Sequence, residues 1–159
     1  MTAVYYMVRD IVDMAVAKEK KRRDFYATVT ELSSNPDMKG LFHFLTEEED
    51  KHVAVFSKIR DRLPDKSGAE PLQGERANYI VSIIDEKLYS KMESREFVQQ
   101  AIDTWNVFRI AIGFEKDAIL FFTEFLPHLT EEDRKMVENL IEQEKGHIRK
   151  LVKVMQQLD

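Results

Sequence analysis

The stretch FLTEEEDKHVAVFSKI, residues 44–59, has a counterpart in NLIEQEKGHIRKLVKV, residues 139–154. Both contain a Glu-x-x-His pair at the same place in the alignment, with apolar residues at matching positions on either side. The pairs are Glu49 with His52, and Glu144 with His147. Since residues three apart share one face of a helix, each pair directs a carboxylate and an imidazole to one place. We therefore expect two copies of one helical unit.

The correspondence extends upstream of these pairs. Glu19-Lys20 followed by Phe25-Tyr26 parallels Glu115-Lys116 followed by Phe121-Phe122. The lone Glu precedes the paired Glu by 30 residues in the first half and by 29 in the second. The halves are therefore predicted to be copies related by an approximate two-fold axis.

The spacing of apolar residues predicts four long helices. They cover Val8–Leu32, Met38–Leu63, Arg95–Leu126 and the segment from Thr130 to Leu158. The connections at 33–37 and 127–130 are short, which favours antiparallel neighbours, and Asp37 and Thr130 are candidate helix caps. Residues 64–93 form a long connection with a short amphipathic helix expected at Tyr79–Tyr89. The predicted fold is all-α, an antiparallel four-helix bundle of two hairpins joined by a long crossover.

Composition narrows the class of protein. A chain of 159 residues is suited to one domain, residues 1–159. The chain has no cysteine, which excludes thiolate metal sites and thiol redox chemistry. A net charge of -5 without a basic stripe argues against nucleic-acid binding. No apolar stretch reaches the roughly 20 residues of a membrane span, and no secretory signal is evident, so a cytoplasmic location is expected.

Six polar residues fall on inward seams where the pattern requires apolar ones. They are Glu19, Glu49, His52, Glu115, Glu144 and His147. A buried carboxylate costs several kcal/mol unless a cation compensates it. Four glutamates carry four negative charges, which two divalent cations would neutralise. Oxygen and imidazole ligands suit iron or manganese, with zinc also possible.

This arrangement resembles the rubrerythrin-like branch of the ferritin-like superfamily over nearly the whole chain. In that family each hairpin supplies one lone Glu and one Glu-x-x-His motif, matched here by Glu19 and Glu115 and by the two pairs. An aromatic residue seven positions after the lone Glu is also typical, and is present as Tyr26 and Phe122. The resemblance implies a di-iron site in which Glu49 and Glu144 bridge the metals or lie close to doing so. Each histidine would then bind one metal, although the sequence does not decide which glutamates bridge.

Two departures from the family pattern change what the resemblance implies. The best-known rubrerythrins have a further Glu one turn after the third-helix Glu, and it takes part in a redox-linked ligand change. Ala118 stands there in this chain, so that change is not implied. Residues 1–159 also lack the cysteines of a rubredoxin domain. Electrons would therefore come from another protein or from substrate iron.

Three functions are compatible with these observations. The first is a di-iron oxidoreductase that reduces peroxide or dioxygen with electrons from an external donor protein, expected to be a homodimer. The second is a ferroxidase that handles iron for storage or detoxification. The third is a metal-free helical binding module.

Several further residues near the seams have open or minor roles. Tyr26 either hydrogen-bonds a ligand carboxylate, shuttles an electron or is simply a core residue with a satisfied hydroxyl. Arg22, one turn after Glu19, either extends outward or pairs with a carboxylate. Glu48, like Glu47 and Glu142, is predicted to be a surface charge, and Trp105 is predicted to belong to the core.

Overall fold

The computed structural model describes residues 7–63, 75, 78–79, 82 and 91–158. Regular structure in these residues is entirely helical, which confirms the predicted all-α class. The elements are α1 (Val8–Leu32), α2 (Pro36–Arg62), α5 (Arg95–Asp103), α6 (Val107–Phe125), the 3₁₀ turn η1 (Leu126–His128) and α7 (Glu131–Leu158).

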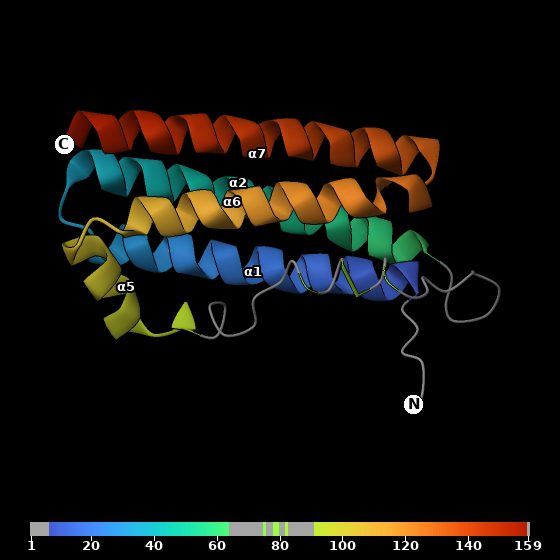
Figure 1. The fold of residues 1–159 in the computed structure, drawn as a ribbon, viewed down its shortest axis with the longest axis horizontal. Coiled ribbons are helices and arrows are strands. Elements are labelled where there is room, and N and C mark those ends of the chain that lie inside the picture. Colours follow the sequence, from blue (N-terminus) through green and yellow to red (C-terminus); the bar gives the residue numbers. More distant parts are fainter. Residues whose placement is uncertain (1–6, 64–74, 76–77, 80–81, 83–90, 159) are drawn as a thin grey trace.

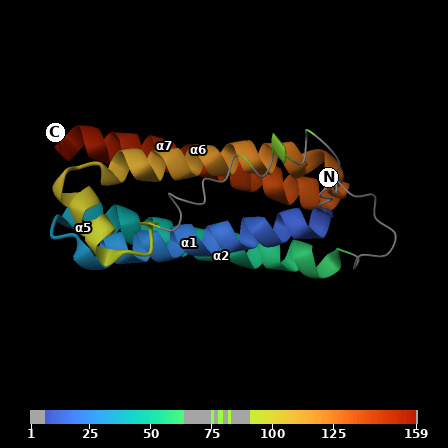
Figure 2. The same ribbon diagram turned by 60° about the horizontal axis from the view of Figure 1, so that its bottom comes forward.

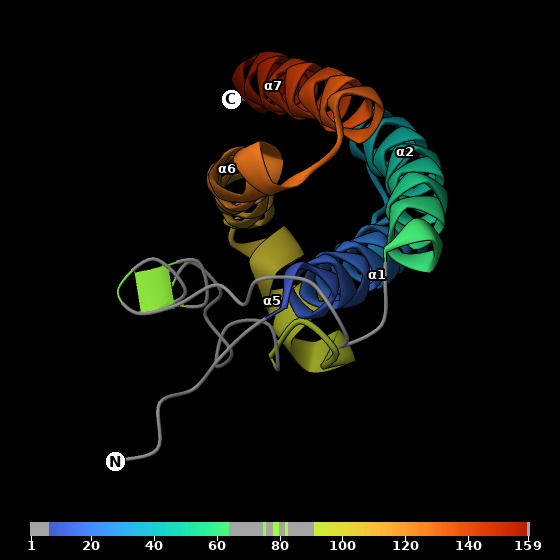
Figure 3. The same cartoon turned by 90° about the vertical axis from the view of Figure 1, so that its right-hand side faces the viewer.

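Four long helices run side by side and form the predicted ferritin-like bundle (Figures 1 and 3). Helix α1 packs on α2 in one antiparallel hairpin, and α6 packs on α7 in the other. Contacts of α2 with α7 and of α1 with α6 join the hairpins. The predicted helix at 79–89 and the rest of the crossover lie almost wholly outside the described residues.

Helix caps explain where two of these helices begin. The Asn35 side chain accepts hydrogen bonds from the backbone N–H groups of Asp37 (2.9 Å) and Met38 (3.1 Å). Pro36 follows at the first helical position, where its missing N–H costs nothing. The cap is therefore Asn35, and the prediction of Asp37 was wrong. Thr130 caps α7 as expected, because its Oγ1 accepts from the Asp133 N–H at 3.2 Å.

The predicted third helix is interrupted near its start. Trp105 has a φ of 61° and its N–H bonds to the carbonyl of Ile102, so the α-helical ladder breaks between α5 and α6. The Thr104 hydroxyl donates to the Gln100 carbonyl at 2.8 Å, a side-chain bond that competes with helix continuation. As Figure 2 shows, α5 turns out of line with α6, and it packs against α1.

Trp105 is consequently not a core residue. Its side chain is 50% exposed at the bend, whereas the sequence pattern placed it on the inward seam. The apolar spacing continues through the break, and neither Gly nor Pro marks it. The prediction of one continuous helix therefore failed at a position that only the backbone conformation reveals.

Two apolar clusters fill the bundle, one towards each end. The first uses Ile11–Val16 of α1 and Val53–Ile59 of α2, and the second uses Phe25–Val29 and Met38–Leu45 of the same helices. Glu19 lies between the clusters along α1, as Glu49 and His52 do along α2. The core thus has a polar layer between two apolar ones.

No helix among the described residues is both long and apolar enough to cross a membrane.

Candidate metal centre

The structure buries all six polar residues that the sequence singled out. Glu19, Glu49, Glu115, Glu144 and His52 have no exposed surface, and His147 is 3% exposed. They come from α1, α2, α6 and α7, so each long helix contributes to one layer in the middle of the bundle. The inward orientation expected from the seam pattern therefore agrees with the structure, while their role as metal ligands stays a prediction.

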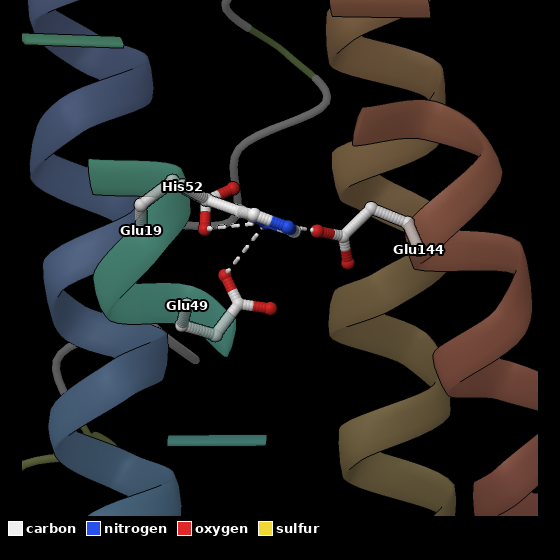
Figure 4. A group of neighbouring side chains, drawn as sticks. All are labelled: Glu19, Glu49, His52 and Glu144. Carbon is white, nitrogen blue, oxygen red and sulfur yellow. Dashed lines mark ion pairs between the residues drawn. The ribbon is translucent and has the colours of Figure 1, made fainter. Parts of the chain in front are cut away.

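Four of the side chains form a first group around His52 (Figure 4). The ring Nδ1 atom lies 2.6 Å from Glu144 Oε1, 3.6 Å from Glu49 Oε2 and 3.8 Å from Glu19 Oε2. These donor atoms lie within 4.8 Å of one another. One cation could therefore bind between the imidazole and the three carboxylates.

A second group is arranged in the same way around His147. Its Nδ1 atom lies 3.5 Å from Glu144 Oε2, 3.6 Å from Glu115 Oε2 and 3.8 Å from Glu49 Oε1. Glu49 and Glu144 belong to both groups and turn one oxygen towards each histidine. The two histidine rings are stacked, with centroids 5.7 Å apart and an interplanar angle of 14°. The geometry provides two adjacent cation positions that share two carboxylates.

Several buried polar atoms of this layer have no hydrogen-bond partner among the described residues. Both oxygens of Glu49 are buried without a hydrogen-bond partner, as are Glu19 Oε2, Glu115 Oε2 and His147 Nδ1. Buried acceptors of this kind are normally paired, and leaving a charged one unpaired is costly. These glutamate and histidine atoms belong to the two groups above and are of the kinds that bind iron, manganese or zinc. The residues therefore fit a two-metal site.

The side chains around His52 shift one another's pKa values strongly. Burial opposes the charged form of His52, but its hydrogen bond to Glu144 and the charges of Glu144 and Glu19 outweigh burial and raise its pKa to about 9. Burial likewise opposes ionisation of Glu144, yet its close contacts with His147 and His52 and the charges of these rings lower its pKa to about 2. Burial raises the pKa of Glu19 despite the charge of Arg22. Without metal, a proton on His52 therefore compensates part of the negative charge.

Tyr26 forms the hydrogen bond to a carboxylate that was one of its three predicted roles. Its hydroxyl donates to Glu115 Oε1 at 2.7 Å, and its side chain is fully buried. The bond crosses from α1 to α6 and leaves Glu115 Oε2 directed at His147. Phe122, the corresponding aromatic residue of the second half, has no hydroxyl and packs on Phe56 with ring centroids 4.7 Å apart.

Arg22 turns inward rather than towards solvent. The side chain is 2% exposed, its Nη2 pairs with Glu19 Oε1, and its Nη1 donates to the Phe114 carbonyl at 3.1 Å. Because a guanidinium is always protonated in proteins, it is a permanent cation beside the site. Two divalent ions and Arg22 together carry five positive charges, whereas the four glutamates carry four negative ones. The neutral total that the sequence predicted for the site therefore does not hold.

Two residues next to the ligands were missed. Gln143 Oε1 lies 2.9 Å from His52 Nε2, and Glu48 Oε2 lies 3.9 Å from His147 Nε2, so each approaches the histidine of the other hairpin. Glu48 is only 16% exposed, so its prediction as a surface charge was wrong. The signal was available in the repeat, because both residues immediately precede the Glu of a Glu-x-x-His pair.

Comparison with known proteins agrees with this geometry. Residues 10–155 match the family model described as Rubrerythrin. A crystal structure of a candidate ferritin-like diiron-carboxylate protein from Thermotoga maritima is 27% identical, with a TM-score of 0.71 and 98% of each chain covered. A DUF305 fragment from Deinococcus radiodurans shares the fold at 15% identity, with a TM-score of 0.66 over 94% of this chain and 95% of that one. No curated protein gave a significant match.

Proposed function

Because this chain belongs to the rubrerythrin family, we propose that it is a di-iron oxidoreductase that reduces hydrogen peroxide or dioxygen. The observation that carries the proposal is the pair of buried ligand groups that share Glu49 and Glu144. A structural neighbour at 27% identity is itself reported as a candidate diiron-carboxylate protein. The family supports a di-iron protein, and the redox reaction is the step that we add.

The six residues divide naturally between two ions. Glu19 and His52 would hold one, Glu115 and His147 would hold the other, and Glu49 and Glu144 would contact both. A pair of iron ions supplies the capacity to give two electrons to one small oxidant. Manganese or zinc would fit the same donors, but zinc has no redox chemistry of its own.

The protein's own side chains hold the carboxylates of this buried layer in place. Tyr26 holds Glu115 through Oε1, and Arg22 holds Glu19 through Oε1. Buried aromatic residues close the layer on both sides, among them Phe25 and Phe42 at one end and Phe56 at the other. Exclusion of water strengthens every electrostatic contact inside and limits the oxidants to small molecules.

Electrons would reach the site from a separate donor protein. Thiolate-bound iron cannot form within these 159 residues, because they contain no cysteine. A soluble redox protein is the chemical class of partner that we propose. We also propose that the chain forms a homodimer in the cytoplasm.

Stopped-flow spectroscopy tests the reaction directly. Ferrous-loaded protein mixed anaerobically with hydrogen peroxide should be oxidised at least tenfold faster than free ferrous ion in the same buffer. Glu144→Gln removes a shared carboxylate and should abolish the acceleration. Glu142→Gln, an exposed change two positions away on α7, should leave it intact. Oxidation no faster than that of free ferrous ion would refute the proposal.

Two alternatives are separated by other measurements. Iron storage requires a large hollow assembly, so a particle far larger than a dimer in light scattering would favour the ferroxidase. A metal-free binding module predicts no bound iron or manganese by elemental analysis after loading. We rank the metal-free module below the oxidoreductase, because six buried polar side chains are costly in a protein without metal. We rank storage lower because it needs a large hollow shell, whereas the homodimer that we propose is a small assembly.

A further inference from the structure

The two hairpins match ligand for ligand, but they differ at the residues immediately beside the ligands. Arg22 follows Glu19 by three positions, whereas Ala118 follows Glu115 by three. Glu48 precedes Glu49 in the first half, and Gln143 takes that place in the second. These two substitutions each change one charge within an otherwise symmetric site.

The first difference places a cation against the Glu19 position. Arg22 is 2% exposed and contacts Glu19 Oε1 directly, so only Oε2 of that carboxylate faces His52. The guanidinium is also held by the Phe114 carbonyl at 3.1 Å, which fixes it in place. A divalent ion here must share Glu19 with Arg22 and is repelled by it. The repulsion is stronger than on the surface because both Arg22 and Glu19 are buried.

Among the described residues, no permanently charged side chain contacts Glu115 in this way. Its Oε1 accepts from the neutral Tyr26 hydroxyl at 2.7 Å, and Ala118, 1% exposed, carries no charge. The full negative charge of Glu115 is therefore available to a cation. Orientation of the carboxylate by Tyr26 reduces the entropy that binding would otherwise cost.

The second difference acts through the outer nitrogens of the histidine rings. His52 Nε2 faces the neutral Gln143 amide oxygen at 2.9 Å, and His147 Nε2 faces the Glu48 carboxylate at 3.9 Å. The Glu48 carboxylate is too far from His147 for a hydrogen bond and acts on the ring through its negative charge, which favours a bound cation there, whereas the Gln143 amide carries no net charge. Lys51 also pairs with Glu48 at 2.7 Å, but its side chain is 71% exposed and solvent screens its charge.

Both differences favour the same position. We propose that the two metal positions have unequal affinities, with the Glu115–His147 position binding first and tightly and the Glu19–His52 position binding second and more weakly. Arg22 and Glu48 are the positioning residues that set this order. The inference rests on the proposed two-metal site and adds the order in which the two metal ions bind.

Cobalt titration of the full chain in competition with a chromophoric chelator tests the order without any turnover. Metal-free protein should bind two Co²⁺ ions with Kd values at least tenfold apart. Glu19→Gln should remove the weaker step and keep the tighter one, while Glu115→Gln should remove the tighter step. Loss of the tighter step in Glu19→Gln would overturn the proposed order.

Variants of the positioning residues test the cause. Arg22→Met should strengthen the weaker step at least fivefold, and Arg22→Lys, which keeps the charge, should preserve most of the gap. Glu48→Gln copies the second half and should weaken the tighter step. Arg23→Met is the matched control, because Arg23 pairs with Asp24 and Asp50 on the exposed surface. It should change neither step.

The outcomes distinguish this inference from the proposed function. Two Co²⁺ ions bound with equal affinity would leave the two-metal site standing and overturn the unequal loading. Absence of Co²⁺ binding would overturn the proposed function itself. Should Arg22→Met fail to fold by circular dichroism, the wild-type titration and the Glu19→Gln and Glu115→Gln variants still decide the order.

Discussion

At the scale of the residue, the site is a layer of buried charges that destabilises the metal-free protein. Glu49 illustrates this, since both carboxylate oxygens are buried and neither accepts a hydrogen bond in the described residues. Partial compensation comes from Arg22 beside Glu19 and from His52, whose Nδ1 lies 2.6 Å from Glu144 Oε1 and whose raised pKa favours the charged ring. Removal of a shared carboxylate from this layer should therefore weaken metal binding and stabilise the metal-free protein.

Tyr26→Phe should loosen Glu115 without disturbing the packing of the ring. The loss of its hydrogen bond should destabilise the protein by about 1 kcal/mol and weaken metal binding at the Glu115 position roughly tenfold. Cobalt affinity and urea unfolding measure the two effects. Tyr79→Phe changes a hydroxyl on a ring that is 48% exposed and serves as the control. Unchanged cobalt affinity in Tyr26→Phe would contradict a positioning role for this tyrosine.

The pH dependence of the metal-free protein follows from His52. Its pKa is about 9 in the folded state and about 6.5 in the unfolded state. The folded protein therefore binds the proton more tightly, and the resulting stability is complete below pH 6.5 and is lost as pH rises through 9. The shift corresponds to a contribution on the order of 3 kcal/mol.

Urea unfolding with chelator present, compared at pH 6 and pH 9, measures this loss. His52→Gln should remove most of the difference in unfolding free energy between the two pH values. His43→Gln changes an exposed histidine on the same helix and should retain the difference. A wild-type protein equally stable at both pH values would contradict the assignment of the proton to His52.

At the scale of the element, capping residues decide where α2 and α7 start. The interruption between α5 and α6 has no such local signal in the sequence. The α2 start depends on Asn35, which satisfies two backbone N–H groups. The interruption after α5 has no comparable sequence signal, because Thr104 and Trp105 are compatible with a helix on their own. The direction of α5 against α1 is set by packing rather than by local preference.

Asn35→Ala should lower the unfolding free energy by about 1 kcal/mol, because two N–H groups at the start of α2 lose their acceptor. Chemical denaturation followed by circular dichroism measures the change. Ser34→Ala, an exposed neighbouring change, should have an effect within about 0.5 kcal/mol. Equal effects of the two variants would show that the cap does not stabilise α2.

At the scale of the whole molecule, the bundle is two apolar clusters separated by the polar layer. Each hairpin brings one lone Glu and one Glu-x-x-His pair, so the layer is complete only when both hairpins associate. Metal binding and association of the hairpins should therefore be coupled, because the site does not exist in the unfolded chain.

Metal should stabilise the fold, and the gain should depend on the shared carboxylates. A metal concentration 100 times the Kd should add about 2.7 kcal/mol per site, seen as a rise in Tm. Glu49→Gln should abolish most of that rise and make the metal-free protein more stable, since an uncompensated buried charge is removed. Glu47→Gln, a change at an exposed position, should keep the wild-type response. A metal-free Glu49→Gln protein less stable than wild type would contradict the electrostatic account.

The sequence by itself determined the helical class, the two hairpins and the six inward polar residues, because these depend on periodicity and on a repeat that the chain displays in its order of residues. The tertiary structure alone decided the direction of Arg22, the break at Trp105 and the contacts of Glu48 and Gln143 with the histidines of the opposite hairpins. Each of these depends on how one helix faces another. Spacing along a helix gives the face on which a side chain lies, whereas its partner across the bundle is fixed only when the hairpins pack.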